Sequence, residues 1–185
     1  MRRGFKTEAE RIAQDMRAAT GKKTTDPLDA FELANHLGAQ VRSADELTTV
    51  DKLEALEKLQ PGAFSACTYT LNNKHVIVYN PLASPSRTQS DLAHEAAHIL
   101  LGHALKEVHT LGGIAFFVCD PDEEQEANWL AGCLLLPRPL LLAAVRRGMN
   151  AGMIAQAFNV SEQMASFRLR TTAVERQLGS APRSR

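Results

Sequence analysis

The residues best suited to chemistry lie in one short segment, His94-Glu95-Ala96-Ala97-His98, which has the pattern His-Glu-x-x-His. Residues four apart lie on the same face of a helix, so His94 and His98 can bind one metal ion together. Glu95 lies beside that pair, where it can act on a water molecule at the metal. Two imidazole ligands next to a carboxylate base are typical of zinc peptidases. The segment therefore predicts a catalytic Zn2+ site, and the alternative is a pair of hydrogen-bonded core histidines.

A catalytic zinc site also needs a third protein ligand and an open coordination position. One known arrangement has a third histidine six residues after the second, but Ala104 occupies that position here. His103 is out of register for a ligand, and we assign it to helix capping or to a hydrogen bond with a ligand. The other arrangement takes a glutamate from a later helix. The acidic helix predicted after Asp120-Pro121 offers three candidates: Glu123, Glu124 and Glu126.

Helical spacing favours Glu124 among these three glutamates. Ala127 and Ala131 share its face, and such small residues allow a close approach to the helix of the histidines. Asn128 lies one turn further on and can accept a hydrogen bond from a ligating histidine, which would fix its tautomer. Glu126 points away from this face.

The composition is that of a globular protein, because 44% of the 185 residues are hydrophobic and 23% are charged. This length fits one domain, which we place at residues 1–178, followed by a basic tail at 179–185. The formal net charge of zero argues against a dedicated nucleic-acid binder. It hides an asymmetry: residues 1–137 carry 13 Lys and Arg against 19 Asp and Glu, whereas residues 138–185 carry 8 against 2.

The cellular compartment follows from what the sequence lacks. No apolar run reaches transmembrane length, and the first residues do not form the hydrophobic segment of a secretion signal. Cys67, Cys119 and Cys133 are odd in number and far apart, as expected for thiols in a reducing compartment. We therefore predict a cytoplasmic protein with no membrane partner.

The elements that position the site follow from hydrophobic spacing and turn residues. Residues 5–62 are predicted to form helices, the first opened by a capping box at Thr7 and Glu10 and the second by Asp26 before Pro27. These helices come before the segment that carries the predicted metal ligands.

Residues 63–137 are predicted to supply a β-hairpin turning at Asn72-Asn73, then the His94 helix and the acidic helix. The edge strand of the hairpin can pair with an extended substrate, or it is an ordinary covered edge. Residues 138–178 are predicted to form the C-terminal helices. The predicted fold class is α+β: a mostly helical, zincin-like minimal metallopeptidase with a small antiparallel β-sheet and a C-terminal helix-turn-helix-like αα-hairpin.

The last predicted elements are a short helix, a turn at Phe158-Asn159-Val160 and a second helix opened by Ser161. With five arginines from Arg168 onward, DNA binding is conceivable for this pair of helices. We favour an αα-hairpin packed on the rest of the domain. The reason is that the second helix begins Ser-Glu-Gln-Met, which offers few bases for contact with phosphates.

Taken together, these motifs resemble the ImmA/IrrE family of metallopeptidases over about residues 5–175. The segments that carry the resemblance are the His-Glu-x-x-His segment with Leu100-Leu101-Gly102-His103, then Glu124–Ala131, Leu134–Pro137, and Phe158–Ser161 with Arg168-Leu169. In that family the glutamate placed like Glu124 is the third zinc ligand. Two departures change only packing: Leu130 stands where the family usually has Phe, and Leu136 where Met is common.

The resemblance implies a zinc endopeptidase of bacteria, prophages and other mobile elements. Such proteins cleave a helix-turn-helix repressor of the XRE type, often encoded nearby, and so relieve repression after stress or DNA damage. Some occur beside toxin–antitoxin-like pairs, so an antitoxin is also a candidate substrate. The alternatives are a protein that binds the repressor without cutting it and a DNA-binding regulator with a vestigial metal site.

The mechanism expected from the motif is metal-assisted amide hydrolysis. Zinc bound by His94, His98 and Glu124 activates water, and Glu95 takes its proton and passes it to the leaving amine. A further donor must stabilise the oxyanion. The candidates for that donor are His75, His103, His109, Tyr69 and Tyr79.

Overall fold

The computed structural model describes residues 1–103, 108–111, 114–117 and 120–179, with side chains described for residues 1–103 and 120–177. Its helices are α1 (Phe5–Ala19), α2 (Ala30–His36), the 3₁₀ helix η1 (Ala44–Glu46), α3 (Val50–Leu59), α4 (Pro85–Leu101), α5 (Pro121–Leu135), α6 (Arg138–Arg146), α7 (Ala151–Ala157), α8 (Glu162–Thr172) and α9 (Val174–Gly179). Its strands are β1 (Gln40–Ser43), β2 (Ala66–Leu71), β3 (Lys74–Tyr79), β4 (Val108–Leu111) and β5 (Ile114–Phe117).

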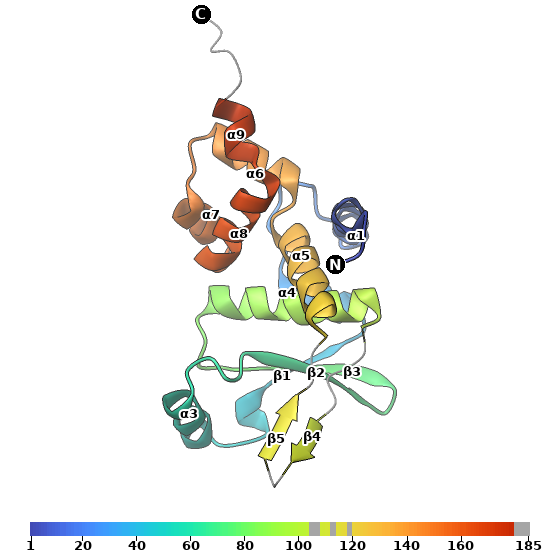
Figure 1. The fold of residues 1–185 in the computed structure, drawn as a ribbon, viewed down its shortest axis with the longest axis vertical. Coiled ribbons are helices and arrows are strands. Elements are labelled where there is room, and N and C mark those ends of the chain that lie inside the picture. Colours follow the sequence, from blue (N-terminus) through green and yellow to red (C-terminus); the bar gives the residue numbers. More distant parts are fainter. Residues whose placement is uncertain (104–107, 112–113, 118–119, 180–185) are drawn as a thin grey trace, which may run out of the picture.

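Helix α4 lies across one face of the larger sheet, and α5 crosses α4 on its other side (Figure 1). The expected α+β class is confirmed.

The larger sheet has the strand order β1-β3-β2. Strands β2 and β3 form the predicted hairpin, turning at Asn72 and Asn73, which have φ of 48° and 62°. Asparagine tolerates this left-handed conformation, which tight hairpin turns require. Strand β1 pairs with β3 in parallel, so the sheet is mixed and the expected wholly antiparallel sheet is wrong at this edge. The segment with η1 and α3 connects β1 to β2 at the opposite edge of the sheet, and β3 then returns to lie between these two strands.

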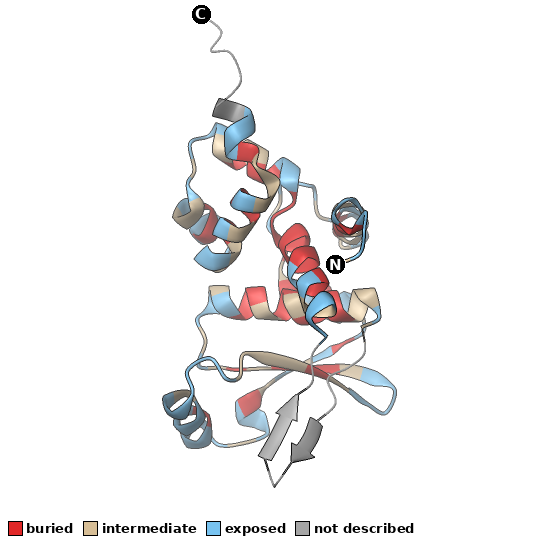
Figure 2. Ribbon diagram, in the orientation of Figure 1, coloured by how far each residue is buried: buried red, intermediate tan, exposed pale blue. Residues whose placement is uncertain are grey.

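The two faces of β3 belong to two different clusters of buried residues. Ile77 joins the main core beneath α4, which gathers residues from Phe5 to Val174. Val76 and Val78 face the opposite side, where they pack with Leu53 of α3. Figure 2 shows that buried residues follow α4 and α5 along most of their lengths. These two helices therefore form the centre of the molecule.

Helix α1 begins earlier than the capping box at Thr7 and Glu10 predicts. It starts at Phe5, which is fully buried, after Gly4 with φ of 83°. The carboxylate of Glu10 cannot reach back to cap the helix, because it accepts a hydrogen bond from Arg168 at 2.6 Å. A long-range ion pair has replaced a local cap.

Helix α2 begins three residues later than Asp26-Pro27 predicts. Asp29 is its N-cap, and its side chain accepts hydrogen bonds from the backbone N–H groups of Phe31 and Glu32. The Asp26 carboxylate instead accepts from the backbone N–H of Lys23 at 2.8 Å. Asp26, the predicted cap of this helix, therefore stabilises the turn that precedes it.

The predicted C-terminal αα-hairpin is present as α7 and α8. Asn159, with φ of 49°, turns the chain between them, and the Ser161 side chain accepts from the Met164 backbone N–H at 3.1 Å. Helix α9 follows in the segment predicted to form the C-terminal helices, and it runs to Gly179, one residue past the predicted end of that segment.

Among the residues that the structure describes, no single helix has both the length and the apolarity needed to cross a membrane. Helices α5 and α6 meet those criteria only as a pair, and they are bent by 54° at the break between them.

Candidate metal centre

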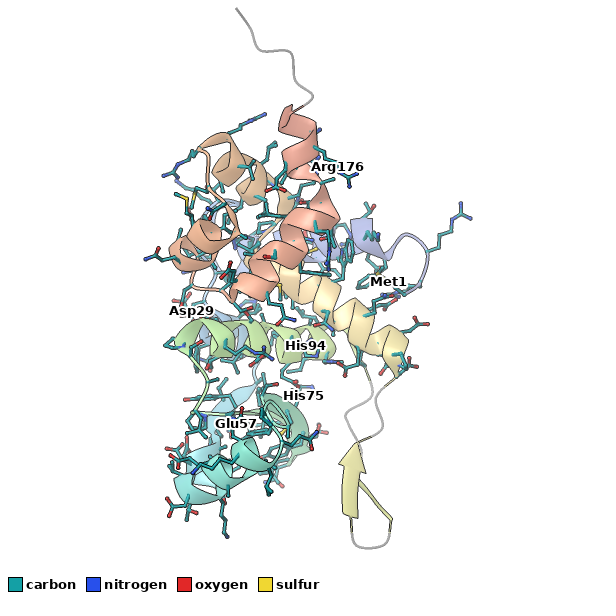
Figure 3. All side chains as sticks on the ribbon, turned by 60° about the vertical axis from the view of Figure 1, so that its left-hand side comes forward. Met1, Asp29, Glu57, His75, His94 and Arg176 are labelled. Carbon is teal, nitrogen blue, oxygen red and sulfur yellow. The ribbon has the colours of Figure 1, made fainter. Side chains whose placement is uncertain are left out.

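Helix α4 carries both histidines of the motif. It begins after Ser84, whose hydroxyl accepts a hydrogen bond from the backbone N–H of Arg87, and it ends at Gly102 with φ of 64°. His94 and His98 project one turn apart, and their Nε2 atoms are 3.0 Å from each other. Figure 3 shows His94 on α4, between the β-sheet and α5. Both imidazoles therefore direct the same ring nitrogen at one point.

Helix α5 brings Glu124 to that point. Asp120 caps this helix as predicted, accepting from the backbone N–H of Asp122 at 2.8 Å. Glu124 Oε2 is 3.2 Å from His94 Nε2, and its Oε1 is 3.6 Å from His98 Nε2. One ligand atom from each of the three side chains lies within 4.8 Å of the other two. Neither Glu123 nor Glu126 belongs to this group, so the preferred glutamate is the one that the fold brings to the histidines.

Small side chains let α4 and α5 approach closely. Ala93 and Ala97 on α4 and Ala127 and Ala131 on α5 are fully buried, and the two helices pack directly on each other. Larger residues at these positions would separate the glutamate from the histidines.

The three side chains differ in their exposure. The side chain of His98 is 8% exposed, whereas His94 is 17% and Glu124 is 28% exposed. The group is thus buried on one side and open to solvent on the other. A catalytic metal site has this arrangement, because it must leave one coordination position for water or substrate.

Glu95 does not belong to the group of three side chains and is hydrogen-bonded to the sheet. It is 3% exposed, and its Oε2 accepts a hydrogen bond from the hydroxyl of Thr68 at 2.7 Å. Thr68 lies on the edge strand β2, opposite Ile77, and so faces α4. Sequence reasoning missed Thr68; the signal available was an inward-facing hydroxyl at an alternating position of the predicted hairpin. Glu95 is therefore fixed beside His94 by a neutral donor that leaves one carboxylate oxygen for other work.

A comparison with protein families covers the segment that carries these side chains. The sequence model described as the IrrE N-terminal-like domain, of the family Peptidase_M78, matches residues 54–170. That match covers more than half of the chain and includes both histidines, Glu95 and Glu124. The chain belongs to this peptidase family. No curated protein matches it.

Within this IrrE-like domain, His103 lies against the more buried histidine. Its Nδ1 is 3.0 Å from Nδ1 of His98, and the two rings meet edge to face with centroids 5.0 Å apart. The side chain of His103 is 7% exposed. The sequence predicts either helix capping or a hydrogen bond with a ligand for His103. The contact with His98 corresponds to the second of these roles.

Asn128 lies elsewhere than expected. It is exposed, and its side-chain amide donates to the backbone carbonyl of Glu124 at 2.8 Å. An asparagine within a helix commonly bonds the carbonyl one turn back, because that acceptor is always within reach. Asn128 therefore bonds to the backbone of α5 rather than to an imidazole of the candidate metal centre.

Glu126, which helical spacing turns away from the ligand face, is buried and paired. Its Oε1 accepts from the backbone N–H of Arg2 at 2.8 Å, and its Oε2 is 3.4 Å from Arg2 Nε and 3.8 Å from His103 Nε2. Sequence reasoning missed this contact because Arg2 is 124 residues away in the chain.

Two of the candidate oxyanion donors are engaged in packing contacts. Tyr69 packs with Val76 and Val78 on the α3 side of the sheet. The ring of Tyr79 meets Phe31 of α2 edge to face, with centroids 5.7 Å apart. Packing, rather than catalysis, accounts for both tyrosines.

The three histidine candidates for the oxyanion donor have different surroundings. His103 is engaged by His98, and the side chain of His109 lies outside the described part of the structure. His75 pairs with Thr70 and shares the sheet face of Thr68. Its Nδ1 is buried without a hydrogen-bond partner among the described residues. Among the described candidates, His75 is therefore the one with a ring nitrogen that makes no hydrogen bond.

Asp91 lies about one turn before His94 on α4. Both of its oxygens are 2.9 Å from Arg87 Nε, one turn earlier in α4. Burial nevertheless raises the pKa of the Asp91 carboxyl, and the Arg87 cation opposes this shift. Asp91 is thus paired within its own helix.

The C-terminal hairpin is attached to the peptidase helices. The backbone N–H of Ser161, at the start of α8, donates to Ser90 Oγ of α4 at 3.0 Å. Arg168 is fully buried, so this arginine of the basic C-terminal region is not available to a phosphate backbone. Both observations fit the αα-hairpin interpretation better than DNA recognition by α8.

Proposed function

We propose that the chain is a zinc-dependent endopeptidase in which His94, His98 and Glu124 bind the metal and Glu95 is the general base. The observation that carries this proposal is the convergence of two Nε2 atoms and one carboxylate within 4.8 Å, in a member of a peptidase family. Two imidazoles and a carboxylate form a donor set that suits zinc, and catalytic zinc commonly has three protein ligands of these types. Zinc bound there would lower the pKa of a coordinated water and polarise the scissile carbonyl.

Glu95 is suited to moving the proton in this reaction. Its Oε2 is held by Thr68, and the residue is nearly excluded from solvent. A carboxylate in such a place accepts the proton of the attacking water and then donates it to the leaving amine nitrogen. The proton thus moves from the nucleophile to the leaving group through a single side chain.

We further propose that the substrate is an XRE-type repressor or antitoxin encoded nearby, cleaved in the cytoplasm to relieve repression under stress. The ImmA/IrrE resemblance supports this choice. The edge strand β2 adds support, because it carries Thr68 beside Glu95 and pairs only with β3 among the described strands. An extended segment of substrate could add to such an edge through backbone hydrogen bonds.

The test is a side-by-side digestion of the neighbouring repressor by the wild-type protein, Glu95→Gln and Glu123→Gln. Glutamine keeps the shape of Glu95 but cannot take up a proton, so cleavage should fall by about 10²–10⁴-fold. Zinc content should be unchanged, and Glu123→Gln should cleave as the wild type does. A chelator should stop cleavage, and added zinc should restore it.

Two results would count against the proposal. Cleavage by Glu95→Gln at the wild-type rate would remove Glu95 from the mechanism. Derepression by both proteins without any fragments would instead indicate a protein that binds the repressor without cutting it.

A further inference from the structure

A line of polar side chains leads away from the metal centre toward the N-terminal segment. It runs from His98 to His103, then to Glu126 on α5, and ends at Arg2. The successive distances are 3.0 Å between the two Nδ1 atoms, 3.8 Å from His103 Nε2 to Glu126 Oε2, and 2.8 Å from the Arg2 backbone nitrogen to Glu126 Oε1. Figure 3 shows Met1 beside α5, so the start of the chain lies close to this helix.

The contacts are consistent with one arrangement of protons. Nε2 of His98 faces His94 and Glu124, and a nitrogen that binds metal must be unprotonated. The proton of neutral His98 is then on Nδ1, which donates to Nδ1 of His103. His103 consequently carries its own proton on Nε2, the nitrogen that faces Glu126. Glu126, at ion-pair distance, electrostatically favours a proton on the nitrogen of His103 that faces it.

Burial makes this line of contacts costly to break. The side chains of His98, His103 and Glu126 are 8%, 7% and 10% exposed, and a buried polar group without a partner is unfavourable. Arg2 compensates the buried charge of Glu126 through both its backbone N–H and its Nε.

The other histidine has no such support. Nδ1 of His94 is buried and has no hydrogen-bond partner among the described residues. The orientation of one imidazole is therefore set by outer contacts, whereas that of its neighbour depends on packing.

We propose that His103 and Glu126 are positioning residues that orient His98 for metal binding, and that Arg2 anchors this line from the N-terminal segment. The inference rests on the proposed function, because it takes His98 as a ligand. It makes the metal affinity depend on a residue at the start of the chain, far from the motif in sequence.

The test is zinc affinity, measured by competition with a chromophoric chelator on folded protein. His103→Ala should weaken zinc binding by about 10–100-fold, the range for partners of a ligating histidine. Glu126→Gln should weaken it less, and Arg2→Ala least, because its backbone N–H remains. Glu123→Gln and Arg3→Ala are matched controls that should bind zinc as the wild type does.

A second readout separates orientation from general stability. In ¹⁵N-histidine-labelled zinc protein, His98 should show a protonated Nδ1 and a metal-bound Nε2, and His103→Ala should disturb that pattern. If His103→Ala does not fold, the comparison of Glu126→Gln with Glu123→Gln decides the question.

The outcomes distinguish this inference from the proposed function. Zinc retained by His98→Ala would overturn the ligand assignment itself, and this inference with it. Zinc lost by His98→Ala, with wild-type affinity and an unchanged His98 pattern in His103→Ala, would overturn the positioning role alone. Equal weakening by Glu126→Gln and Glu123→Gln would also contradict it, since only Glu126 contacts His103.

Discussion

Charged side chains cluster near both ends of helix α5, and the two clusters differ in what their charges accomplish. Near its start, Glu124 meets two imidazole nitrogens that lie 3.0 Å apart. Near its end, the fully buried guanidinium of Arg168 donates to Glu10 at 2.6 Å and to the carbonyl of Leu136 at 3.0 Å. The second cluster pairs a cation with an anion inside the protein. The cluster around Glu124 instead gathers two imidazole nitrogens and a carboxylate, which together can bind a metal cation.

A structural cluster can be distinguished from a chemical one by whether its charges neutralise one another. The Arg168 cluster joins α1, α5 and α8, and Gly132 leaves room for it: a Cβ there would be 2.4 Å from Arg168 Cδ. Complementary charge and close packing of this kind hold helices together. The Glu124 cluster is partly open to solvent, and its members are complementary to a cation rather than to one another. Substitutions at the two ends of α5 should therefore have opposite consequences.

The largest expected effect is on metal binding at the start of α5. Glu124→Ala should weaken zinc binding by more than about 100-fold, beyond the range for residues that only support a ligand. Because Glu124 is partly exposed, the unfolding free energy of the metal-free protein should change by less than about 1 kcal/mol. Metal analysis and urea unfolding on the same samples measure both quantities. If Glu126→Ala loses more zinc than Glu124→Ala, the ligand assignment is wrong.

A loss of folding stability, without a loss of zinc affinity, is expected at the other end of α5. Arg168→Ala should lower the unfolding free energy by about 2–5 kcal/mol, because it empties the space of a fully buried side chain and removes the donor to Glu10 and to the Leu136 carbonyl. Zinc affinity of the folded fraction should stay at the wild-type value. A large loss of zinc affinity in fully folded Arg168→Ala would show that the two ends of α5 are coupled, and would contradict separate structural and metal-binding roles.

A smaller effect is expected from adding one methyl group near the same ion pair. Gly132→Ala should destabilise the protein by about 1–3 kcal/mol, since Arg168 is held by two hydrogen bonds and must shift. The matched control is Gly152→Ala in α7, where a Cβ meets nothing closer than 3.6 Å. That change should stabilise by about 0.5–1 kcal/mol through helix propensity. Equal effects at the two glycines would contradict the close packing at Arg168.

The smallest effect concerns the thiol beside this cluster. Burial raises the pKa of Cys133 to about 12, so the thiol stays protonated in the folded protein at ordinary pH. Its stabilising contribution is present below the pKa of the unfolded thiol and disappears as pH rises through the folded value. Iodoacetamide at about pH 8.5 should leave the Cys133 peptide unmodified until denaturant is added, as mass spectrometry can show. Rapid alkylation of native protein would indicate that this end of α5 opens.

Local signals in the sequence predict the centre of the fold well. The turn at Asn72-Asn73 and the N-caps at Asp120 and Ser161 need only neighbouring residues, and the structure has all three. The choice of Glu124 also follows from local helical spacing, because small residues on one face predict a close approach.

The contacts that the sequence does not predict join residues far apart in the chain. Glu10 is taken from its local capping box by Arg168, which is 158 residues away. Thr68 reaches Glu95 only because the hairpin packs beneath α4, and Glu126 meets Arg2 only once α1 has docked on α5. Helical periodicity gives the side of a helix on which a residue lies, but it does not identify the partner that a distant segment brings there.

The ligand assignment can be tested by locating zinc in crystals of the metal-loaded protein, with anomalous scattering at the zinc edge. We expect one zinc ion per chain, bound by Nε2 of His94 and His98 at about 2.0–2.1 Å and by a Glu124 oxygen at about 2.0–2.2 Å. Glu95 should lie outside the coordination sphere, with Thr68 still donating to it. An ion bound instead by His103 and Glu126, or no ion at the histidine pair under saturating zinc, would contradict this assignment.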